Sequence, residues 1–174
     1  MNSSRTCQRC GVRSQREEMF TSLCLDVFLD ATVEQLLQDY QQTVPVDYAC
    51  RCGSNKSIMA STFHTLPQNL ILQLKRFKTA TMEKRHDAVH LSPELQVPTH
   101  LSDRFYRLVS IISHSGTTPD SGHYRSFGLH PDQRGGQRWL CYDDNIVSAT
   151  RGPDVFRGVQ ETAYVLFYQK QRTC

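Results

Sequence analysis

The segment Ser121-Gly122-His123-Tyr124 opens one predicted strand, and Tyr142-Asp143-Asp144 closes the next. Hydrolysis by a thiol requires an imidazole that takes the proton of the nucleophile, together with a third group that orients this imidazole. A histidine and a carboxylate must therefore be brought together by the fold. His123 and Asp143 are the first candidates for these two roles.

The spacing of the two segments predicts how they meet. A hairpin centred on Gln133 would place His123 directly opposite Asp143, because both lie ten residues from the centre. Directly opposed residues have Cβ atoms about 5 Å apart. Asp144 would point to the face of the sheet opposite to Asp143, unless a bulge changes its direction. Gly122 has no side chain and would let a substrate backbone approach His123 closely. The alternative interpretation is a strand-end histidine and an unrelated polar turn.

The rest of the chain is predicted to be rich in strands. A capping box at Thr32-Val33-Glu34-Gln35 predicts a short helix that ends near Gln41. Leu70-Ile71-Leu72 is apolar on both faces, as in the central strands of a sheet that is covered on both sides. Polar loops are expected at 79–90 and 114–121. The predicted strands are 19–27, 57–63, 69–77, 104–113, 123–127, 138–142 and 162–169.

The composition indicates one globular domain. The 174 residues carry a net charge of +3, and the basic side chains are scattered, unlike the stripe that follows a phosphate backbone. No stretch approaches the roughly 18 apolar residues of a membrane span, and the opening residues lack the apolar core of a signal peptide. We therefore expect an intracellular protein, cytoplasmic or nuclear, without nucleic acid or membrane as a partner.

Two close cysteine pairs, Cys7/Cys10 and Cys50/Cys52, stand out among seven cysteines. An odd count with paired spacing is more typical of metal ligands than of disulfides. Four thiolates can hold one structural zinc ion. The second pair has one intervening residue instead of the usual two, so both sulfurs reach one metal only if the backbone distorts. The alternative is four reduced thiols without a metal.

Several segments together resemble the ubiquitin-specific proteases. The histidine box of that family is similar to His114-Ser115-Gly116 through Ser121-Gly122-His123-Tyr124, followed by Tyr142-Asp143-Asp144. Its closing strand is similar to Ala163-Tyr164-Val165-Leu166-Phe167-Tyr168, and its palm strand resembles Leu74-Lys75-Arg76-Phe77. Spacing and order agree over nearly the whole chain, which makes the combination far more specific than any of its pieces.

The resemblance implies a papain-like α+β fold, mostly antiparallel sheet, whose fingers and palm grip ubiquitin or ubiquitinated proteins. It implies a partial catalytic domain over 1–174, with zinc-bearing fingers at about 1–60 and a palm at about 61–174. The implied reaction is isopeptide hydrolysis at the ubiquitin C-terminus. By the same resemblance, His123 is the general base and Asp143 orients it. Asp144 is a secondary candidate near the oxyanion.

The family's catalytic cysteine has no counterpart in this sequence. In the family it lies on a helix within an Asn-rich box upstream of the fingers, whereas this chain opens almost directly on Cys7. The thumb that carries the box is therefore expected to be missing, and an N-terminal thumb segment becomes an expected partner. Cys24, Cys141 and Cys174 lack the neighbours of a thiol activated at a helix N-terminus. We expect the isolated chain to be inactive.

Two other functions stay open on the sequence alone. A module of this kind can bind ubiquitin or another partner without cleaving it, and a small zinc-ribbon protein can bind nucleic acid. The weak basic balance, without aromatic residues interleaved among basic ones, argues against nucleic acid. The presence of a Cys box upstream would distinguish the enzyme hypothesis from the binding-module hypothesis.

Overall fold

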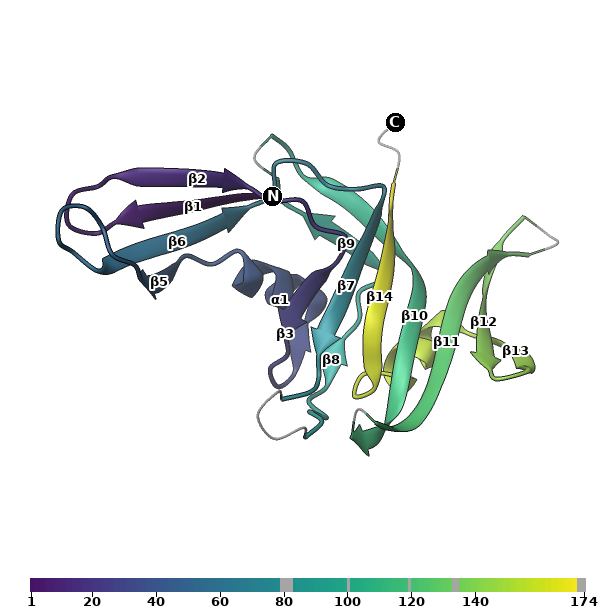
Figure 1. Ribbon diagram of the computed structural model, residues 1–174. Coiled ribbons are helices and arrows are strands. Elements are labelled where there is room, and N and C mark those ends of the chain that lie inside the picture. The colour runs from purple at the N-terminus through teal and green to yellow at the C-terminus, as the bar shows by residue number, and fades with distance from the viewer. Residues whose placement is uncertain (79–82, 100, 119, 133–134, 172–174) are drawn as a thin grey trace.

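The computed structural model describes residues 1–78, 83–99, 101–118, 120–132 and 135–171. The predicted hairpin centre, Gln133, and the last cysteine, Cys174, lie outside these ranges, as does part of the loop predicted at 79–90. Two sheets make up most of the molecule, a narrow one at one end and a broad one that fills the rest (Figure 1). Neither helix in the described part of the chain is long and apolar enough to cross a membrane.

The smaller sheet has the strand order β2-β1-β6-β5. Its strands are β1 (Asn2–Cys7), β2 (Arg13–Glu17), β5 (Val44–Asp47) and β6 (Lys56–Thr62). All of its neighbouring strands are antiparallel. This sheet projects away from the rest of the molecule, so the two cysteine pairs lie far from the broad sheet (Figure 1).

The larger sheet has the order β13-β12-β11-β10-β14-β7-β3, with β9 paired to β10. All of these pairs are antiparallel except the parallel pair of β3 with β7. The bounds are β3 (Leu23–Asp26), β7 (Asn69–Lys75), β9 (Glu94–Val97), β10 (Arg104–Thr118), β11 (Ser121–Pro131), β12 (Gln137–Asp143), β13 (Ile146–Thr150) and β14 (Ala163–Lys170). A short parallel pair joins β4 (Ala31–Thr32) to β8 (Val89–His90). The predicted mostly antiparallel α+β class is confirmed.

Helix α1 (Val33–Tyr40) begins where the sequence predicts it. The Thr32 hydroxyl accepts a hydrogen bond from the Gln35 amide at 3.2 Å, and the Thr32 amide donates to the Gln35 side chain at 2.8 Å. This reciprocal pair satisfies two backbone donors that the helix itself leaves free. Leu36 and Leu37 are buried, so the apolar stripe fixes which side of the helix faces the sheet.

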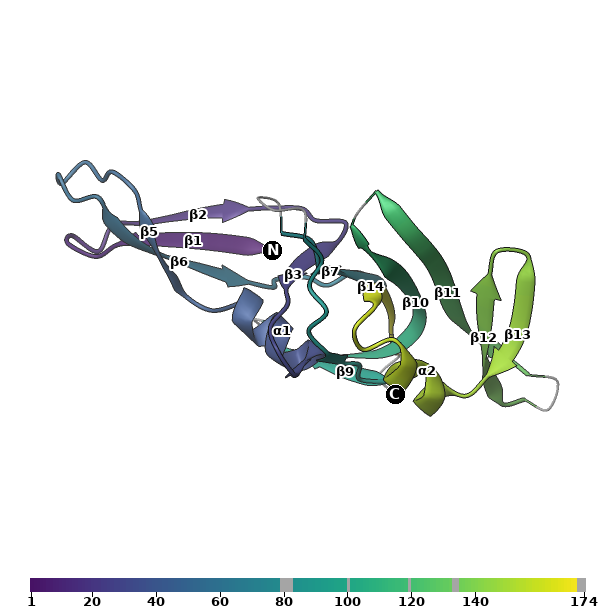
Figure 2. The same ribbon diagram turned by 90° about the horizontal axis from the view of Figure 1, so that it is seen from below.

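One face of the larger sheet is better covered than the other. Figure 2 shows α1, β9 and the second helix, α2 (Gly152–Gly158), on the same side of it. In β7, Leu70 and Leu72 are fully buried, whereas Ile71 between them is only half-buried. The prediction that these central strands are covered on both sides is therefore wrong within the described chain. The less covered face still carries apolar side chains.

Several boundaries differ from the sequence-based predictions. Residues 114–118, expected in a loop, continue β10, so that only a short connection separates it from β11. The strand expected at 19–27 shrinks to β3, and β1, β2, β5, β13 and α2 were not predicted. Strand β2, for example, is exposed at every residue and has no apolar alternation. Pairing with β1 holds it in place.

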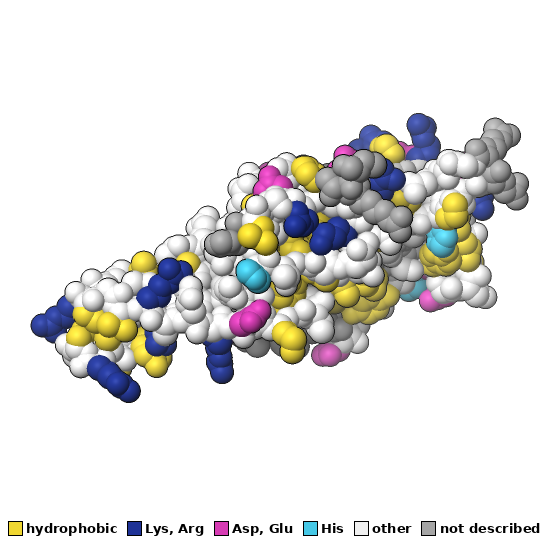
Figure 3. Space-filling model, turned by 90° about the horizontal axis from the view of Figure 1, so that it is seen from above, with side chains coloured by type: hydrophobic (Ala, Val, Ile, Leu, Met, Phe, Trp, Pro, Cys, Tyr) yellow, Lys and Arg dark blue, Asp and Glu magenta, His cyan; other side chains and the backbone are white. Residues whose placement is uncertain are grey.

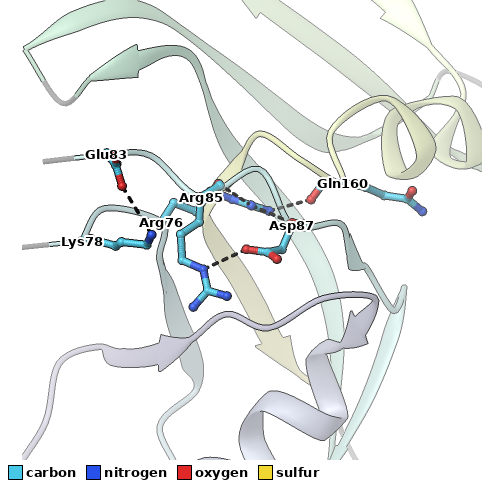
Figure 4. A network of polar contacts seen from close by, with 6 residues as sticks. All are labelled: Arg76, Lys78, Glu83, Arg85, Asp87 and Gln160. Carbon is cyan, nitrogen blue, oxygen red and sulfur yellow. Dashed lines mark hydrogen bonds and ion pairs between the residues drawn. The ribbon is translucent and has the colours of Figure 1, made fainter. Parts of the chain in front are cut away.

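The loop that follows β7 is also less exposed than expected. Arg76 at its start is fully buried, and its guanidinium donates to the carbonyls of Ala163 (2.6 Å), Gln160 (2.6 Å), Asp87 (2.9 Å) and Arg85 (3.2 Å). Figure 4 shows this group beside the ion pair of Arg85 with Asp87. Burial lowers the pKa of Arg76 to about 10, so it stays charged at neutral pH. The buried cation ties the loop to the segment that precedes β14.

Candidate functional site: an imidazole–carboxylate pair and a cysteine cluster

His123 and Asp143 meet at one end of β11 and β12. Nε2 of His123 is hydrogen-bonded to Oδ1 of Asp143. The side chains are 47% and 40% exposed, so the pair lies open to solvent at the edge of the sheet. The two predicted partners are in direct contact.

The predicted register of β11 against β12 is wrong by two residues, although His123 and Asp143 are still in contact. The ladder pairs Ser126 with Tyr142, and extending it would set Asp143 opposite Arg125. His123 is then the diagonal neighbour of Asp143, within reach of long side chains. A shift of two residues keeps each side chain on its face of the sheet, which explains why the contact survives.

The carboxylate controls the protonation of the imidazole. The hydrogen bond from Asp143 raises the pKa of His123, and the charges of Asp143 and Asp144 act in the same direction, while desolvation and Arg125 oppose them. Because Nε2 is held by Asp143, Nδ1 is the ring nitrogen that is left to exchange a proton. This is the arrangement that a general base with an orienting acid requires.

Asp144 occupies a tight turn between β12 and β13. Asp143 pairs with Ile146 across this turn, and Asp144 adopts a left-handed backbone conformation with φ of 51°. One ligand atom from each of His123, Asp143 and Asp144 lies within 4.8 Å of the others. Asp144 also lines a pocket of about 500 Å³ together with Tyr124. It therefore stands beside the imidazole, at the rim of a cavity.

The cysteines that the structure describes lie away from His123. Cys24 is on β3, and three strands separate β3 from β11, which corresponds to about 19 Å at the usual strand spacing. Its Sγ lies 3.6 Å from the side-chain oxygen of Gln73. Cys141 is paired with Phe127 and packs against the core. Among the described residues, no thiol is within hydrogen-bond reach of the imidazole.

The four cysteines of the predicted metal site converge at the end of the smaller sheet. Sγ of Cys7 lies 3.7 Å from that of Cys52, and Sγ of Cys10 lies 3.6 Å from that of Cys50. All four sulfurs lie within 4.8 Å of one another. Sulfurs held tetrahedrally by one zinc ion at 2.3 Å would be about 3.8 Å apart. The cluster therefore has the dimensions of a four-thiolate zinc site.

Local turns explain how the short second pair reaches the cluster. The Gly53 amide donates to the Cys50 carbonyl at 2.9 Å, and Gly53 has φ of +84°, a conformation that favours glycine. This turn brings Cys50 and Cys52 to the same point without a second intervening residue. In the first pair, backbone amides of Cys10 and Arg9 lower the pKa of Cys7 to about 6, which favours the thiolate that a metal requires. In the second pair, the Ser54 amide lowers the pKa of Cys52, but burial and the neighbouring thiols raise it to about 12.

Two further residues lie near the pair of His123 and Asp143, hereafter the dyad, and were not predicted to be functional. His114 on β10 and Lys84 are both buried, at 1% and 8% exposure, although the sequence suggested exposed loops for both. The Lys84 ammonium lies 3.2 Å from Nδ1 of His114 and also donates to the His114 carbonyl. His114 belongs to the segment that resembles the histidine box, but its residue type alone does not show that it is buried beside a lysine.

The structure thus combines a mostly antiparallel α+β fold with a histidine–aspartate pair at the end of its larger sheet. A family model described as ubiquitin carboxyl-terminal hydrolase matches residues 1–168. The chain belongs to the ubiquitin carboxyl-terminal hydrolase family. The resemblance to the ubiquitin-specific proteases is thereby confirmed.

Individual relatives support this assignment. "Ubiquitin carboxyl-terminal hydrolase 25" of Arabidopsis thaliana is 28% identical over 182 residues, covering 98% of this chain and 26% of the relative. A solved SAGA DUB module containing Ubp8, Sgf11, Sus1 and Sgf73 bound to monoubiquitin matches with a TM-score of 0.82 and 28% identity, covering 99% of this chain and 40% of the other.

A second structure of this module, bound to ubiquitin aldehyde, matches with a TM-score of 0.81 and 26% identity, covering 99% and 41% of the two chains. These matches confirm the predicted papain-like protease fold. The chain thus spans about a quarter of the curated relative and two fifths of the matching chains in the solved modules.

Proposed function

We propose that the chain is the ubiquitin-recognising part of a thiol-dependent deubiquitinase, with His123 as general base and Asp143 as its orienting acid. The observation that carries this proposal is the contact of Nε2 with Asp143, which leaves Nδ1 for proton transfer. Nδ1 would take the proton of an attacking thiol and return it to the amine that leaves from the isopeptide bond. Asp144 lies close enough to act near the oxyanion.

Ubiquitin or a ubiquitinated protein is the proposed partner. Two modules of similar fold were solved with monoubiquitin or ubiquitin aldehyde, which supports this choice. The proposed division assigns about 1–60 to fingers and about 61–174 to a palm. The strands of the smaller sheet lie at the two ends of the first range, whereas β3 between them is a strand of the larger sheet and contacts α1.

A structural zinc ion is proposed for the fingers. The sulfurs of Cys7, Cys10, Cys50 and Cys52 would hold it, and the spacing of the cluster supports this. Four protein thiolates leave no open position for water. The metal would therefore brace the tip of the smaller sheet and would take no part in hydrolysis.

The isolated chain is proposed to be inactive, because a general base contributes only when a nucleophile lies within reach of it. We further propose that a thumb segment carrying the family's Cys box docks beside His123 and Asp143, at the end of β11 and β12. The less covered face of the larger sheet offers additional apolar surface to a partner. Half-buried apolar side chains on this face come from adjacent strands: Ile71, Ile112, Val165 and Phe167. Figure 3, which looks along the strands of this sheet, shows apolar side chains exposed over the middle of the molecule.

The partner proposal is tested by titrating ubiquitin into the isotope-labelled chain and following its amide resonances. Perturbations are expected both in the smaller sheet and around His123, since fingers and palm would grip the same molecule. Tetra-ubiquitin serves as the positive comparison. An unrelated acidic protein of the size of ubiquitin serves as the negative one. Absence of any perturbation at high micromolar ubiquitin would refute ubiquitin as the partner.

A non-cleaving binding module is the second candidate, favoured by the absence of a described thiol near His123. The two candidates separate when a separately produced segment with the family's Cys box is added to the chain. The enzyme proposal expects ubiquitin cleavage that His123→Ala abolishes. The binding-module proposal expects ubiquitin binding without cleavage in the same mixture.

A further inference from the structure

The ribbon that carries His123 rests on a buried histidine on its other side. His114 of β10 pairs with Tyr124 of β11, and Ser115 pairs with His123. Because side chains alternate along a strand, His114 and His123 point to opposite faces. The His114 ring lies against the ring of Tyr124, with centroids 4.5 Å apart, so it contacts the residue that follows His123.

The same ring also contacts the residue that precedes His123. A Cβ atom placed on Gly122 would lie 2.3 Å from Nε2 of His114, and one on Gly116 would lie 3.2 Å from its Cε1. Only glycine leaves room for the ring at position 122. His114 therefore touches the chain on both sides of His123 and occupies the space that a side chain before it would need.

Lys84 fixes the orientation of this ring. An ammonium has donors only, so Nδ1 of His114, at 3.2 Å from Nζ of Lys84, has to accept. The second hydrogen bond of the ammonium goes to the carbonyl of His114 itself. Burial, together with the charge of Lys84, lowers the pKa of His114. The ring is therefore neutral and carries its proton on Nε2, on the side of Gly122.

We propose that His114, held by Lys84, is a positioning residue that sets the backbone of residues 122–124 and so aims His123 at Asp143. This inference rests on the proposed role of the dyad. The face opposite His123 is anchored by a locked ring, whereas His123 itself is half-exposed and held by one carboxylate. Loosening the ring would let the His123 backbone shift and weaken its contact with Asp143.

The test measures the pKa of His123 by NMR of the imidazole ring in the full chain, with the resonance assigned from His123→Gln. Lys84→Met keeps the aliphatic stem and removes the ammonium, while His114→Phe keeps a ring and removes the acceptor. Each variant is expected to lose at least half of the difference in the pKa of His123 between the wild type and Asp143→Asn. Lys78→Met is the matched control, because Lys78 is an exposed lysine on the same loop with its own ion pair. It should leave the pKa of His123 unchanged.

The outcomes separate the inference from the function on which it rests. If Asp143→Asn lowers the pKa of His123 but Lys84→Met and His114→Phe leave it at the wild-type value, the positioning role is overturned and the dyad stands. If Asp143→Asn has no effect, the dyad itself fails. A purely structural role would change the midpoint of urea unfolding without changing the pKa of His123 in the folded chain. Should Lys84→Met not fold, His114→Phe decides the question, because it leaves the ammonium its carbonyl acceptor.

Discussion

His123 is held by a single carboxylate in an exposed position, and its protonation should therefore depend on that carboxylate. Asp143 raises the pKa of His123 in the folded chain. In the unfolded chain the ordinary value of about 6.5 applies. The protonated pair thus stabilises the fold below the ordinary pKa, and this contribution is lost as the pH rises through the raised pKa.

The first prediction is that the His123–Asp143 pair stabilises the fold more at low pH than at high pH. The free energy of unfolding of the wild type should exceed that of His123→Gln near pH 5.5, and the difference should shrink as the pH rises toward 8.5. Urea unfolding at a series of pH values measures it. In an Asp143→Asn background the pH dependence of the difference should become smaller, because only the charge of Asp144 still raises the pKa of His123. A difference that grows with rising pH would contradict the pairing.

The second prediction concerns the buried cation. Arg76→Met should lower the free energy of unfolding by about 3–5 kcal/mol, because it leaves buried carbonyls without their donor. Arg85→Met removes a partly exposed ion pair with Asp87 and should cost about 1 kcal/mol or less. Chemical denaturation of both variants gives the comparison. Equal losses would show that the carbonyl network around Arg76 does not stabilise the fold.

The sequence predicted the contact between His123 and Asp143 but not the residues that support it. The prediction came from the spacing of the two residues about one turn and from the resemblance to the ubiquitin-specific proteases. Lys84 and His114 were expected in exposed loops because their neighbours in sequence are polar. Their burial depends on β10 continuing past residue 113 and on a loop folding back over Phe77, contacts that no local pattern records.

At the level of elements, helix α1 depends on its cap as well as on its apolar face. Thr32→Ala removes the hydroxyl that accepts from the Gln35 amide and should cost about 1 kcal/mol in the free energy of unfolding. Thr32→Ser keeps an acceptor and serves as the control. Urea denaturation should rank the wild type and Thr32→Ser above Thr32→Ala. If the serine and alanine variants are equally unstable, the cap does not contribute.

The smaller sheet is predicted to depend on its metal. Protein purified in reducing buffer should contain about one zinc ion per chain by elemental analysis, the ratio for one four-thiolate site. Cys10→Ser should reduce this content sharply, whereas Cys24→Ser, which changes an exposed cysteine outside the cluster, should leave it unchanged. A wild-type zinc content near zero with the fold intact would leave only reduced thiols at the tip.

Elements were predictable where apolar alternation or capping was present. Strand β7 is buried at every second residue and β14 at three residues. The predicted ranges of β6, β7, β12 and β14 overlap the observed ones closely. Strand β2 and helix α2 lack such signals. The first is polar throughout, and the second has only seven residues, with one of them buried. Neighbouring strands and the core determine these elements.

At the scale of the whole molecule, two features bear on the proposed thumb partner. One face of the larger sheet is poorly covered among the described residues, and the imidazole has no thiol within reach among them. The central strands are apolar on both faces, which predicts cover on both sides. Because the described residues cover only one face well, apolar side chains remain on the other face. A docked thumb would supply the thiol, and a partner on the less covered face would shield its apolar side chains.

The most direct test exposes the isolated chain to a fluorogenic ubiquitin substrate and to a thiol-reactive ubiquitin probe. Neither turnover nor a covalent adduct is expected, because His123 and Asp143 have no nucleophile to activate among the described residues. The same assay on the chain mixed with a separately produced segment that carries the family's Cys box provides the comparison, because this mixture can assemble a complete site. Turnover by the chain alone that His123→Ala abolishes, with the probe attached to Cys24 or Cys141, would show that the chain carries its own nucleophile and would refute the proposed inactivity.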